Sequence, residues 1–187
     1  MSKKIGIGLV VVLAIAVAIV ATRPSEFHIE RSKTIAAPAD VVFLFVNDFH
    51  DWPSWSPWEK LDPQMQKSHS GAPLGKGAVY EWSGNDQVGK GRMTIKESRP
   101  NQLVGIQLEF MEPWTATNDT TFTFHGSGST TKLTWAMDGE NDFMAKAFSL
   151  FMDMDALVGK DFETGLDALA KVAAAEAEKR RREVSGQ

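Results

Sequence analysis

The chain has 187 residues, 43% hydrophobic and 24% charged, a composition typical of one compact folded domain with a short extension. It contains no cysteine, which excludes a disulfide-stapled scaffold, a cysteine nucleophile and thiolate metal ligands. The formal net charge is −4, and none of the 24 acidic residues lies among residues 1–23, so the rest of the chain is distinctly acidic. We therefore expect no binding to nucleic acid, which would require a basic surface.

Residues 5–21 form an uninterrupted apolar segment that contains only Ile, Val, Leu, Ala and Gly. A helix of this length spans about 26 Å, close to the roughly 30 Å hydrocarbon core of a bilayer. Because it is apolar around its whole circumference, it predicts a membrane segment. Residues 1–23 are therefore expected to be a single-pass anchor; a cleaved secretory signal is the alternative, although the small residues lie inside the apolar stretch and not after it.

The flanking charges predict an orientation for this anchor. Lys3 and Lys4 precede the apolar segment, whereas Arg23 follows it. Positive residues tend to remain on the cytoplasmic side, so the N-terminus is expected in the cytoplasm and residues 24–187 outside it. Cleavage would instead leave the same domain secreted or periplasmic.

The domain after the anchor begins with a strand and a helix. Alternation over residues 26–34 predicts the strand. Ala37-Pro38 then favours a helix start, and an apolar face continues to Asn47-Asp48. Two prolines in the tryptophan-rich segment 49–58 prevent a long helix, so we expect a short helix or an ordered loop there.

From about residue 64 onward, apolar and polar residues alternate between turn glycines, and the period becomes helical after Gly139. The helical stripe predicts one long amphipathic helix over 142–177, followed by a solvated tail at 178–187. The alternation predicts an antiparallel sheet with one covered face. Its clearest strands are expected at residues 79–83, 88–97, 103–111, 115–125 and 130–138.

Strands grouped before one long helix predict an α+β domain over residues 24–177. In this arrangement a curved antiparallel sheet of about seven strands wraps around the C-terminal helix. A sheet that grips a helix in this way tends to leave a cavity between the two layers.

Five short strings along this order carry a family resemblance: IAAP at 35–38, WSPW at 55–58, VGKGRM at 88–93, TTKLTW at 130–135 and GKDFE at 159–163. They resemble the START-related helix-grip superfamily (SRPBCC), over roughly residues 26–175. The nearest branch is the bacterial polyketide cyclase- or dehydrase-like one, which often carries an N-terminal membrane helix. The resemblance implies a helix-grip fold; the superfamily includes lipid carriers, hormone receptors, cyclases and chaperone activators, so it implies no single function.

Apolar side chains on the covered face are candidate ligand contacts, because ligand pockets are mostly apolar. Core packing demands the same residue types, so both interpretations stay open. The candidates are Tyr80, Trp82, Met93, Ile106, Leu108, Phe110, Phe122, Trp135, Phe148 and Phe151.

Two further features bear on a site. Trp52, Trp55 and Trp58 could line the rim of a ligand entrance, or they could cover one end of the core, which is the preferred interpretation. Asp155 shares the helical stripe of Phe148 and Phe151, where an apolar residue is expected. It could orient a ligand or act as an acid or base with a raised pKa; alternatively, it reaches water at the flank of the helix.

The chain lacks other catalytic patterns. Its four histidines show no metal-ligand spacing, and no Gly-x-Ser-x-Gly elbow occurs, so neither a metal nor a cofactor is expected. Gly165 lies inside the predicted long helix, where glycine costs about 1 kcal/mol relative to alanine. We expect a close approach to the sheet or to the first short helices to require it.

Three functions remain open from the residues. The first is a membrane-anchored domain that binds a hydrophobic small molecule or lipid between sheet and helix. The second is a cyclase or dehydratase, for which Asp155 is the only clear acid–base candidate. The third is a protein-interaction module with a filled core.

Overall fold

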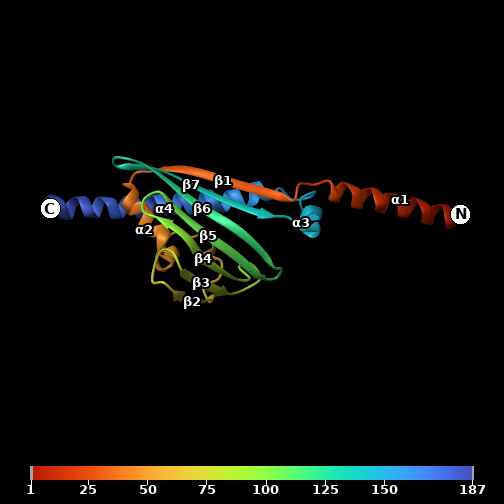
Figure 1. Cartoon of the computed structure of the whole chain (residues 1–187), viewed down its shortest axis with the longest axis horizontal. Helices are drawn as coiled ribbons and strands as arrows, with labels where there is room; N and C mark the ends of the chain where they lie inside the picture. The colour runs from red at the N-terminus through yellow and green to blue at the C-terminus, as the bar shows by residue number, and fades with distance from the viewer. Residues whose placement is uncertain (1, 187) are drawn as a thin grey trace.

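The computed structural model describes residues 2–186, and in the first helix it describes side chains only at residue 8, residue 11 and from residue 14 onward. This helix, α1 (Ser2–Ala21), extends away from the rest of the chain (Figure 1). Residues 5–7, 9, 10, 12 and 13 of the predicted membrane segment lie outside the described side chains. Among the described residues, no helix combines the length and hydropathy that crossing a bilayer requires.

Seven antiparallel strands form one sheet in the order β1-β7-β6-β5-β4-β3-β2, which confirms the predicted sheet. Consecutive strands from β2 to β7 pair as hairpins, and β1 adds to the far edge against β7. The strands are β1 (Glu26–Ile35), β2 (Gln66–Gly71), β3 (Ala78–Ser83), β4 (Lys90–Arg99), β5 (Leu103–Glu112), β6 (Ala116–Ser127) and β7 (Thr130–Glu140).

The register of the strands confirms the predicted alternation of covered and solvent-facing side chains. In β6 and β7, Phe122 lies opposite Trp135, and both are buried on the covered face. On the other face Arg92 lies opposite Glu81 and donates two hydrogen bonds to its carboxylate, at 2.9 and 2.7 Å. Arg92 therefore belongs to the solvent-facing set, as its phase predicts.

The helical part departs from the expected single long helix. Helix α3 (Phe143–Phe148) ends early, and α4 (Met154–Ser185) begins after a break. Each has its own N-cap: Asp142 accepts from the Ala145 N–H and Asp153 from the Ala156 N–H, so the chain restarts a helix at the second cap. The expected tail at 178–187 is helical as far as Ser185, where pairs such as Arg180–Glu176 support it at i,i+4 spacing.

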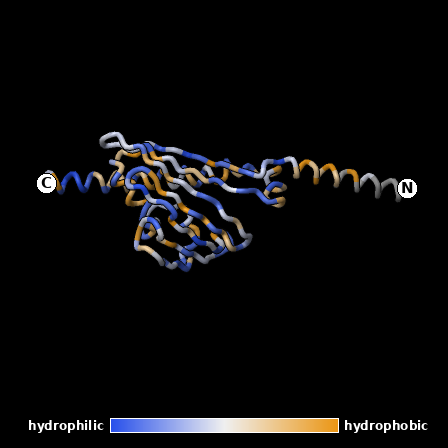
Figure 2. The backbone as a smooth tube through the Cα atoms, in the orientation of Figure 1, coloured by the Kyte–Doolittle hydropathy of each residue, from blue (hydrophilic) through white to orange (hydrophobic). Residues whose placement is uncertain are grey.

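Helix α4 packs mainly against β1 and against α2 (Ala39–Asn47) (Figure 1). Between α2 and β2 the chain forms two short 3₁₀ helices, η1 (Phe49–Ser54) and η2 (Trp58–Lys60), as the prolines predict. The core lies between these elements and the sheet, and the rings of Trp135 and Phe162 stack there with centroids 4.2 Å apart. The C-terminal end of α4 is hydrophilic and extends beyond the sheet (Figure 2).

Candidate ligand cavity

A cavity of about 210 Å³ lies between the covered face of the sheet, the η1–η2 segment and the first turns of α4. Its lining residues come from all three parts of the fold and are mostly apolar. They are Trp52, Ser56, Trp58, Glu59, Met65, Tyr80, Trp82, Gln87, Val88, Met93, Leu108, Phe110, Thr120, Trp135, Met137, Val158, Asp161 and Phe162.

One wall of the cavity is the indole of Trp82, which lies across Gly91 of the neighbouring strand. A Cβ atom at residue 91 would lie 2.4 Å from the Trp82 ring, so only glycine leaves room for this arrangement. The indole N–H of Trp82 donates to the carbonyl of Val88 at 2.9 Å, which fixes the orientation of the ring. Phe110 meets the ring edge to face, with centroids 6.2 Å apart.

Two residues of the lining each hold a buried polar atom that has no hydrogen-bond partner among the described residues: the Thr120 hydroxyl and the Trp135 indole nitrogen. The neighbouring tryptophans differ, because Trp52 donates to the Val46 carbonyl at 3.1 Å and Trp55 to the Phe45 carbonyl at 2.9 Å. A buried polar group without a partner costs about 1–3 kcal/mol. An acceptor oxygen of a bound molecule that reached these atoms would relieve that cost.

The cavity has a charged end. The Glu59 side chain is only 6% exposed and accepts hydrogen bonds from the Tyr80 hydroxyl at 2.6 Å and from Lys67 Nζ at 2.5 Å. Burial, together with the Glu59 carboxylate, raises the pKa of the Tyr80 hydroxyl well above its usual range. From α4, Asp161 lines the cavity as well, and burial raises the pKa of its carboxyl.

The structure places most predicted lining residues at the cavity. Tyr80, Trp82, Met93, Leu108, Phe110 and Trp135 all line it. Ile106 and Phe122 are fully buried in the adjoining core and do not line it.

The structure places Phe148 and Phe151 away from the covered face, contrary to the prediction, and it places Asp155 in water at the helix flank, the alternative stated above. Phe148 is 55% and Phe151 86% exposed, because the break before α4 takes them away from the sheet. Val158 and Phe162 contribute the wall from α4 in their place. Asp155 lies at the surface, where its Oδ2 pairs with an Arg31 guanidinium nitrogen at 3.0 Å.

The Asp155 pair removes the best acid–base candidate of the sequence from the cavity. Hydrogen bonding to Arg31 holds the pKa of the Asp155 carboxyl below its usual range, the opposite of the raised pKa that a dry site would produce. Arg31 also pairs with Glu163, through Nε at 3.0 Å. Asp155 is thus part of a surface ion-pair cluster.

The tryptophan cluster divides between the two predicted roles. Trp55 is 1% exposed and packs against Phe122 and Trp135, so it covers the core. Trp52 and Trp58 line the cavity, and Trp52 is also buried. One cluster therefore covers the core and contributes to the cavity wall.

The predicted close approach at Gly165 is confirmed on both sides. A Cβ atom there would lie 2.8 Å from the Trp135 ring and 3.2 Å from Cδ of Pro57. The glycine therefore lets α4 approach both the sheet and the segment after η1.

Sequence reasoning missed five polar residues of the lining: Ser56, Glu59, Gln87, Thr120 and Asp161. Thr120 shares the phase of Phe122 and Phe124 in β6, so the period-two pattern could have placed it on the covered face. Glu59 and Asp161 had no such signal. Glu59 lies in a three-residue 3₁₀ helix without periodicity, and Asp161 lies at a helix flank whose environment depends on distant strands.

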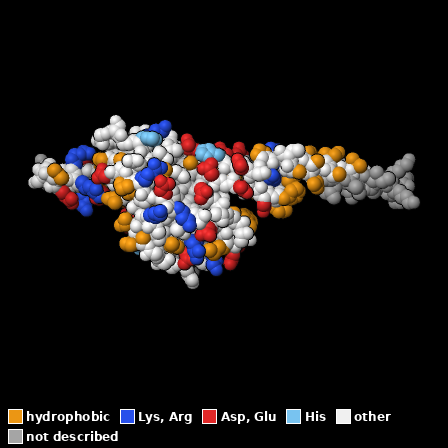
Figure 3. All heavy atoms as spheres, in the orientation of Figure 1, with side chains coloured by type: hydrophobic (Ala, Val, Ile, Leu, Met, Phe, Trp, Pro, Cys, Tyr) orange, Lys and Arg blue, Asp and Glu red, His pale blue; other side chains and the backbone are white. Residues whose placement is uncertain are grey.

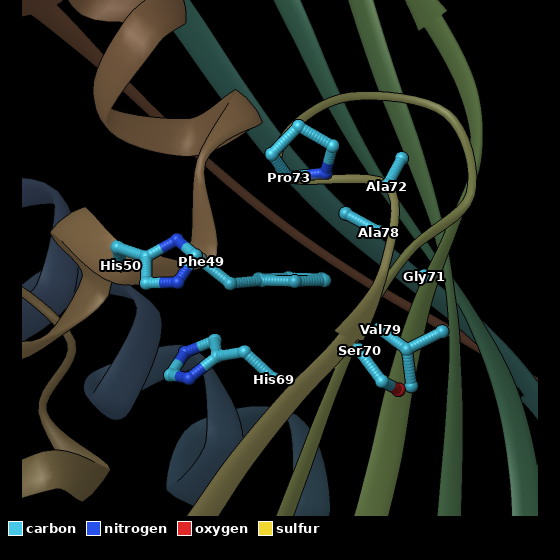
Figure 4. Close-up of a pocket in the computed structure, with 9 residues that line it drawn as sticks. All are labelled: Phe49, His50, His69, Ser70, Gly71, Ala72, Pro73, Ala78 and Val79. Atoms are coloured by element: carbon cyan, nitrogen blue, oxygen red, sulfur yellow. The ribbon is translucent and has the colours of Figure 1, made fainter.

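A second hollow, of about 250 Å³, lies between η1 and the β2–β3 hairpin (Figure 4). The imidazole rings of His50 and His69 stack there with centroids 4.2 Å apart, and Nδ1 of His50 lies 2.7 Å from Oδ1 of Asp48. Within residues 2–186, no group of three or more His, Asp or Glu side chains is arranged to hold a metal ion.

His28 and His69 should titrate in a defined order. Burial, and then the neighbouring His50, lowers the pKa of His69. The Asp138 carboxylate, 2.7 Å from Nδ1 of His28, raises the pKa of His28. On acidification from neutral pH, His28 is therefore expected to take up its proton before His69. A proton NMR titration of the imidazole Cε1–H signals, assigned with His28→Asn and His69→Asn, measures both midpoints; the reverse order would contradict this prediction.

The curved antiparallel sheet, the long C-terminal helix and the cavity between them define a helix-grip α+β domain. Residues 26–174 match the family described as polyketide cyclase / dehydrase and lipid transport, and the chain belongs to that family. No match was found among curated protein sequences.

Solved structures share the fold at low sequence identity. The aromatase/cyclase Zhui from a Streptomyces species is 16% identical, with a TM-score of 0.58 over 84% of this chain and 95% of that one. The Aha1 protein from Colwellia psychrerythraea, solved as a dimer, is 15% identical, with a TM-score of 0.57 over 79% and 96%. A protein from Chromobacterium violaceum is 14% identical, with a TM-score of 0.58 over 79% and 96%.

Proposed function

We propose that this domain binds a compact hydrophobic molecule that carries an oxygen acceptor, in the cavity beneath the start of α4. The observation that carries the proposal is the pair of buried polar atoms without a partner, on Thr120 and Trp135. Apolar burial against the surrounding rings supplies affinity, and an oxygen of the ligand accepts from the hydroxyl and from the indole N–H. Membership of a family that includes cyclases and lipid transport is consistent with this role.

The volume of the cavity limits the size of its ligand. An apolar cavity of about 150 Å³ is known to hold benzene, so about 210 Å³ admits one or two rings or a short acyl segment. A complete two-chain phospholipid is far larger than this space. Among the hydrophobic ligands that the sequence leaves open, the geometry therefore favours a small aromatic or alicyclic ketone, aldehyde or alcohol.

A matched pair of probes tests the role of the acceptor. Acetophenone and α-methylstyrene have nearly the same shape, but only acetophenone has a carbonyl oxygen. The full chain, labelled with ¹⁵N in lipid nanodiscs, is titrated with each probe, and the tryptophan indole N–H signals are followed by NMR. Acetophenone is expected to move the Trp135 indole signal downfield, whereas α-methylstyrene should not. The Trp135→Phe variant identifies the signal.

A second variant separates the hydrogen bond from the shape of the cavity. Thr120→Val keeps the size of the side chain and should weaken acetophenone binding roughly fivefold, the equivalent of one ordinary hydrogen bond. The affinity for α-methylstyrene should stay unchanged or rise slightly. Equal binding of both probes without any indole shift would contradict the proposal.

We also propose that residues 5–21 anchor the domain in a membrane, with residues 24–187 on the extracytoplasmic side. The support is the uniform apolar composition of this segment and the exposure of the described side chains at 14–19, which no other described part of the chain covers. The extension of α1 away from the domain is consistent with an anchor (Figure 1).

A cyclase or dehydratase is the second candidate, and Asp161 is the observation that favours it. Asp161 lines the cavity, and burial raises the pKa of its carboxyl, the direction expected of a catalytic acid or base. Mass spectrometry of the probe after incubation distinguishes the two functions, because a binding protein returns its ligand unchanged. The third expectation, a module with a filled core, does not match the cavity.

A further inference from the structure

The segment from α3 to the first turn of α4 exposes an unusual amount of apolar surface. Seven of its large hydrophobic side chains are between 46% and 86% exposed, and Leu150 is half-buried. Soluble monomers rarely expose contiguous apolar patches of more than a few hundred Å². We call this set the 143–157 surface; it consists of Phe143, Met144, Phe148, Phe151, Met152, Met154 and Leu157.

The 143–157 surface adjoins the apolar helix α1. Helix α3 contacts α1, and Nζ of Lys146 donates at 2.9 Å to the hydroxyl of Ser25, in the short link between α1 and β1. Figure 1 shows α3 at the base of α1, and Figure 3 shows hydrophobic side chains on both. Two apolar surfaces that no other described part of the chain covers are therefore continuous with each other.

The charges beside this surface indicate what kind of contact it makes. Asp142 and Asp153 cap the two helices, and Asp155 is paired with Arg31, so these carboxylates already have partners. Lys146 is the only basic residue within 143–157. Binding that depends on anionic headgroups would need a basic cluster, which is absent from this segment. Exposed phenylalanines with flexible methionines instead suit insertion among acyl chains at the membrane interface.

The same surface leads directly to the cavity. Leu157 is the last exposed member, and the next residue, Val158, lines the cavity together with Phe162 one turn further along α4. A lipid surface that covers residues 143–157 would therefore lie against the helix that forms one cavity wall.

We propose that the 143–157 surface inserts into the interface of a lipid bilayer beside α1, and that the cavity takes up its ligand from that bilayer. The occupant is a lipid surface, and the binding is apolar and independent of anionic lipid. This inference deepens the proposed function and rests on its membrane-anchor part. It assigns α3 and the α3–α4 break a role in placing the cavity at the membrane.

The absence of cysteine allows single-site labelling of the full chain. Phe151→Cys places an environment-sensitive NBD fluorophore at the most exposed residue of the surface. Val184→Cys is the matched control, since Val184 is an apolar residue that is 90% exposed near the C-terminal end of α4. Each labelled protein is reconstituted in phosphatidylcholine vesicles with and without spin-labelled quencher lipids, and alkaline carbonate extraction is performed in parallel.

The label at residue 151 should lose most of its fluorescence to the quencher lipids, and the label at residue 184 should lose little. Adding phosphatidylglycerol or raising the salt concentration should not change the difference. In a chain that also carries Phe148→Ser, the quenching at residue 151 should fall, because one of the flanking apolar contacts is lost. The retained emission at residue 184 would show that the sample remains intact.

Lipid quenching tests the docking of the 143–157 surface, and carbonate extraction tests the membrane anchor, so the two proposals can fail separately. Resistance to extraction without quenching at residue 151 overturns the docking surface and leaves the anchor standing. Quenching at residue 151 in a protein that carbonate extracts supports the docking surface and overturns the anchor. A concentration-dependent blue shift of the label without lipid, with no quenching in vesicles, would show that a second copy of the chain covers the surface and would overturn the proposal.

Discussion

Replacing Gly165 by valine should lower the free energy of unfolding by about 3 kcal/mol. The added Cβ would lie 2.8 Å from the indole of Trp135 and 3.2 Å from the Pro57 ring. Two ring contacts hold the indole in place, because it stacks on Phe162 at 4.2 Å and meets Phe122 at 4.8 Å. Overpacking of a rigid core costs about 1–3 kcal/mol or more, which exceeds the few tenths gained from helix propensity.

Gly159→Val is the matched control on the same helix. Its Cβ would lie even closer to a neighbour, 2.0 Å from an Arg31 guanidinium nitrogen. That neighbour is the end of a flexible side chain whose partners Asp155 and Glu163 are exposed, so it can swing aside. Losing surface ion pairs costs about 0–1 kcal/mol, and the expected change is therefore below 1 kcal/mol.

Urea unfolding of the full chain in a mild detergent, followed by near-ultraviolet circular dichroism, measures both variants. We expect Gly165→Val to lower the free energy of unfolding more than Gly159→Val, although its added Cβ overlaps its nearest neighbour less, at 2.8 Å against 2.0 Å. Similar losses at the two glycines would show that the packing around Trp135 is not the rigid part of this core. Because Trp135 lines the cavity, the Gly165 variant should also weaken acetophenone binding.

Replacing Thr120 by valine should stabilise the protein, in contrast to Gly165→Val. We expect the free energy of unfolding to rise by about 1 kcal/mol. The hydroxyl is buried without a partner, so its removal ends a desolvation cost without opening a void. The same substitution weakens the binding of a ligand that carries an acceptor, as proposed above. A residue that destabilises the empty protein but strengthens ligand binding is typical of a functional site.

Thr131→Val provides the comparison, since Thr131 is equally buried but donates to the Ala37 carbonyl at 2.8 Å. Removing this hydroxyl leaves the carbonyl unsatisfied and should lower stability by about 1–3 kcal/mol. Thermal unfolding of both variants measures the difference. A loss of stability at Thr120 would show that its hydroxyl has a partner in the empty protein, and this would contradict the assigned role.

Much of the fold was predictable because it follows from local periodicity. Alternation in β4 to β7 placed Met93, Leu108 and Trp135 on the covered face, and the register confirms their phase. Gly165, inside the helical stripe, predicted the close approach of α4 to the sheet and to the segment after η1, which the structure confirms. These inferences succeed because each depends on residues two to four positions apart, whose geometry the backbone sets.

The prediction of one long C-terminal helix was wrong because the apolar helical spacing continues through the break between α3 and α4. Phe148 and Phe151 share a stripe with Phe162, yet the cap at Asp153 starts a new helix and leaves both phenylalanines exposed. A carboxylate at an N-cap and a carboxylate inside a helix look alike in a sequence. Asp155 shows the same limit, because Arg31 lies more than a hundred residues away along the chain.

The sheet with its covered face, the apolar N-terminal segment and the family could all be predicted from the order of residues, since they depend on composition and short-range pattern. Three features became visible in the folded chain alone: the cavity, the polar atoms of Thr120 and Trp135 without a described partner, and the exposed 143–157 surface beside α1. The physical reason is that packing and hydrogen-bond satisfaction depend on which distant segments meet.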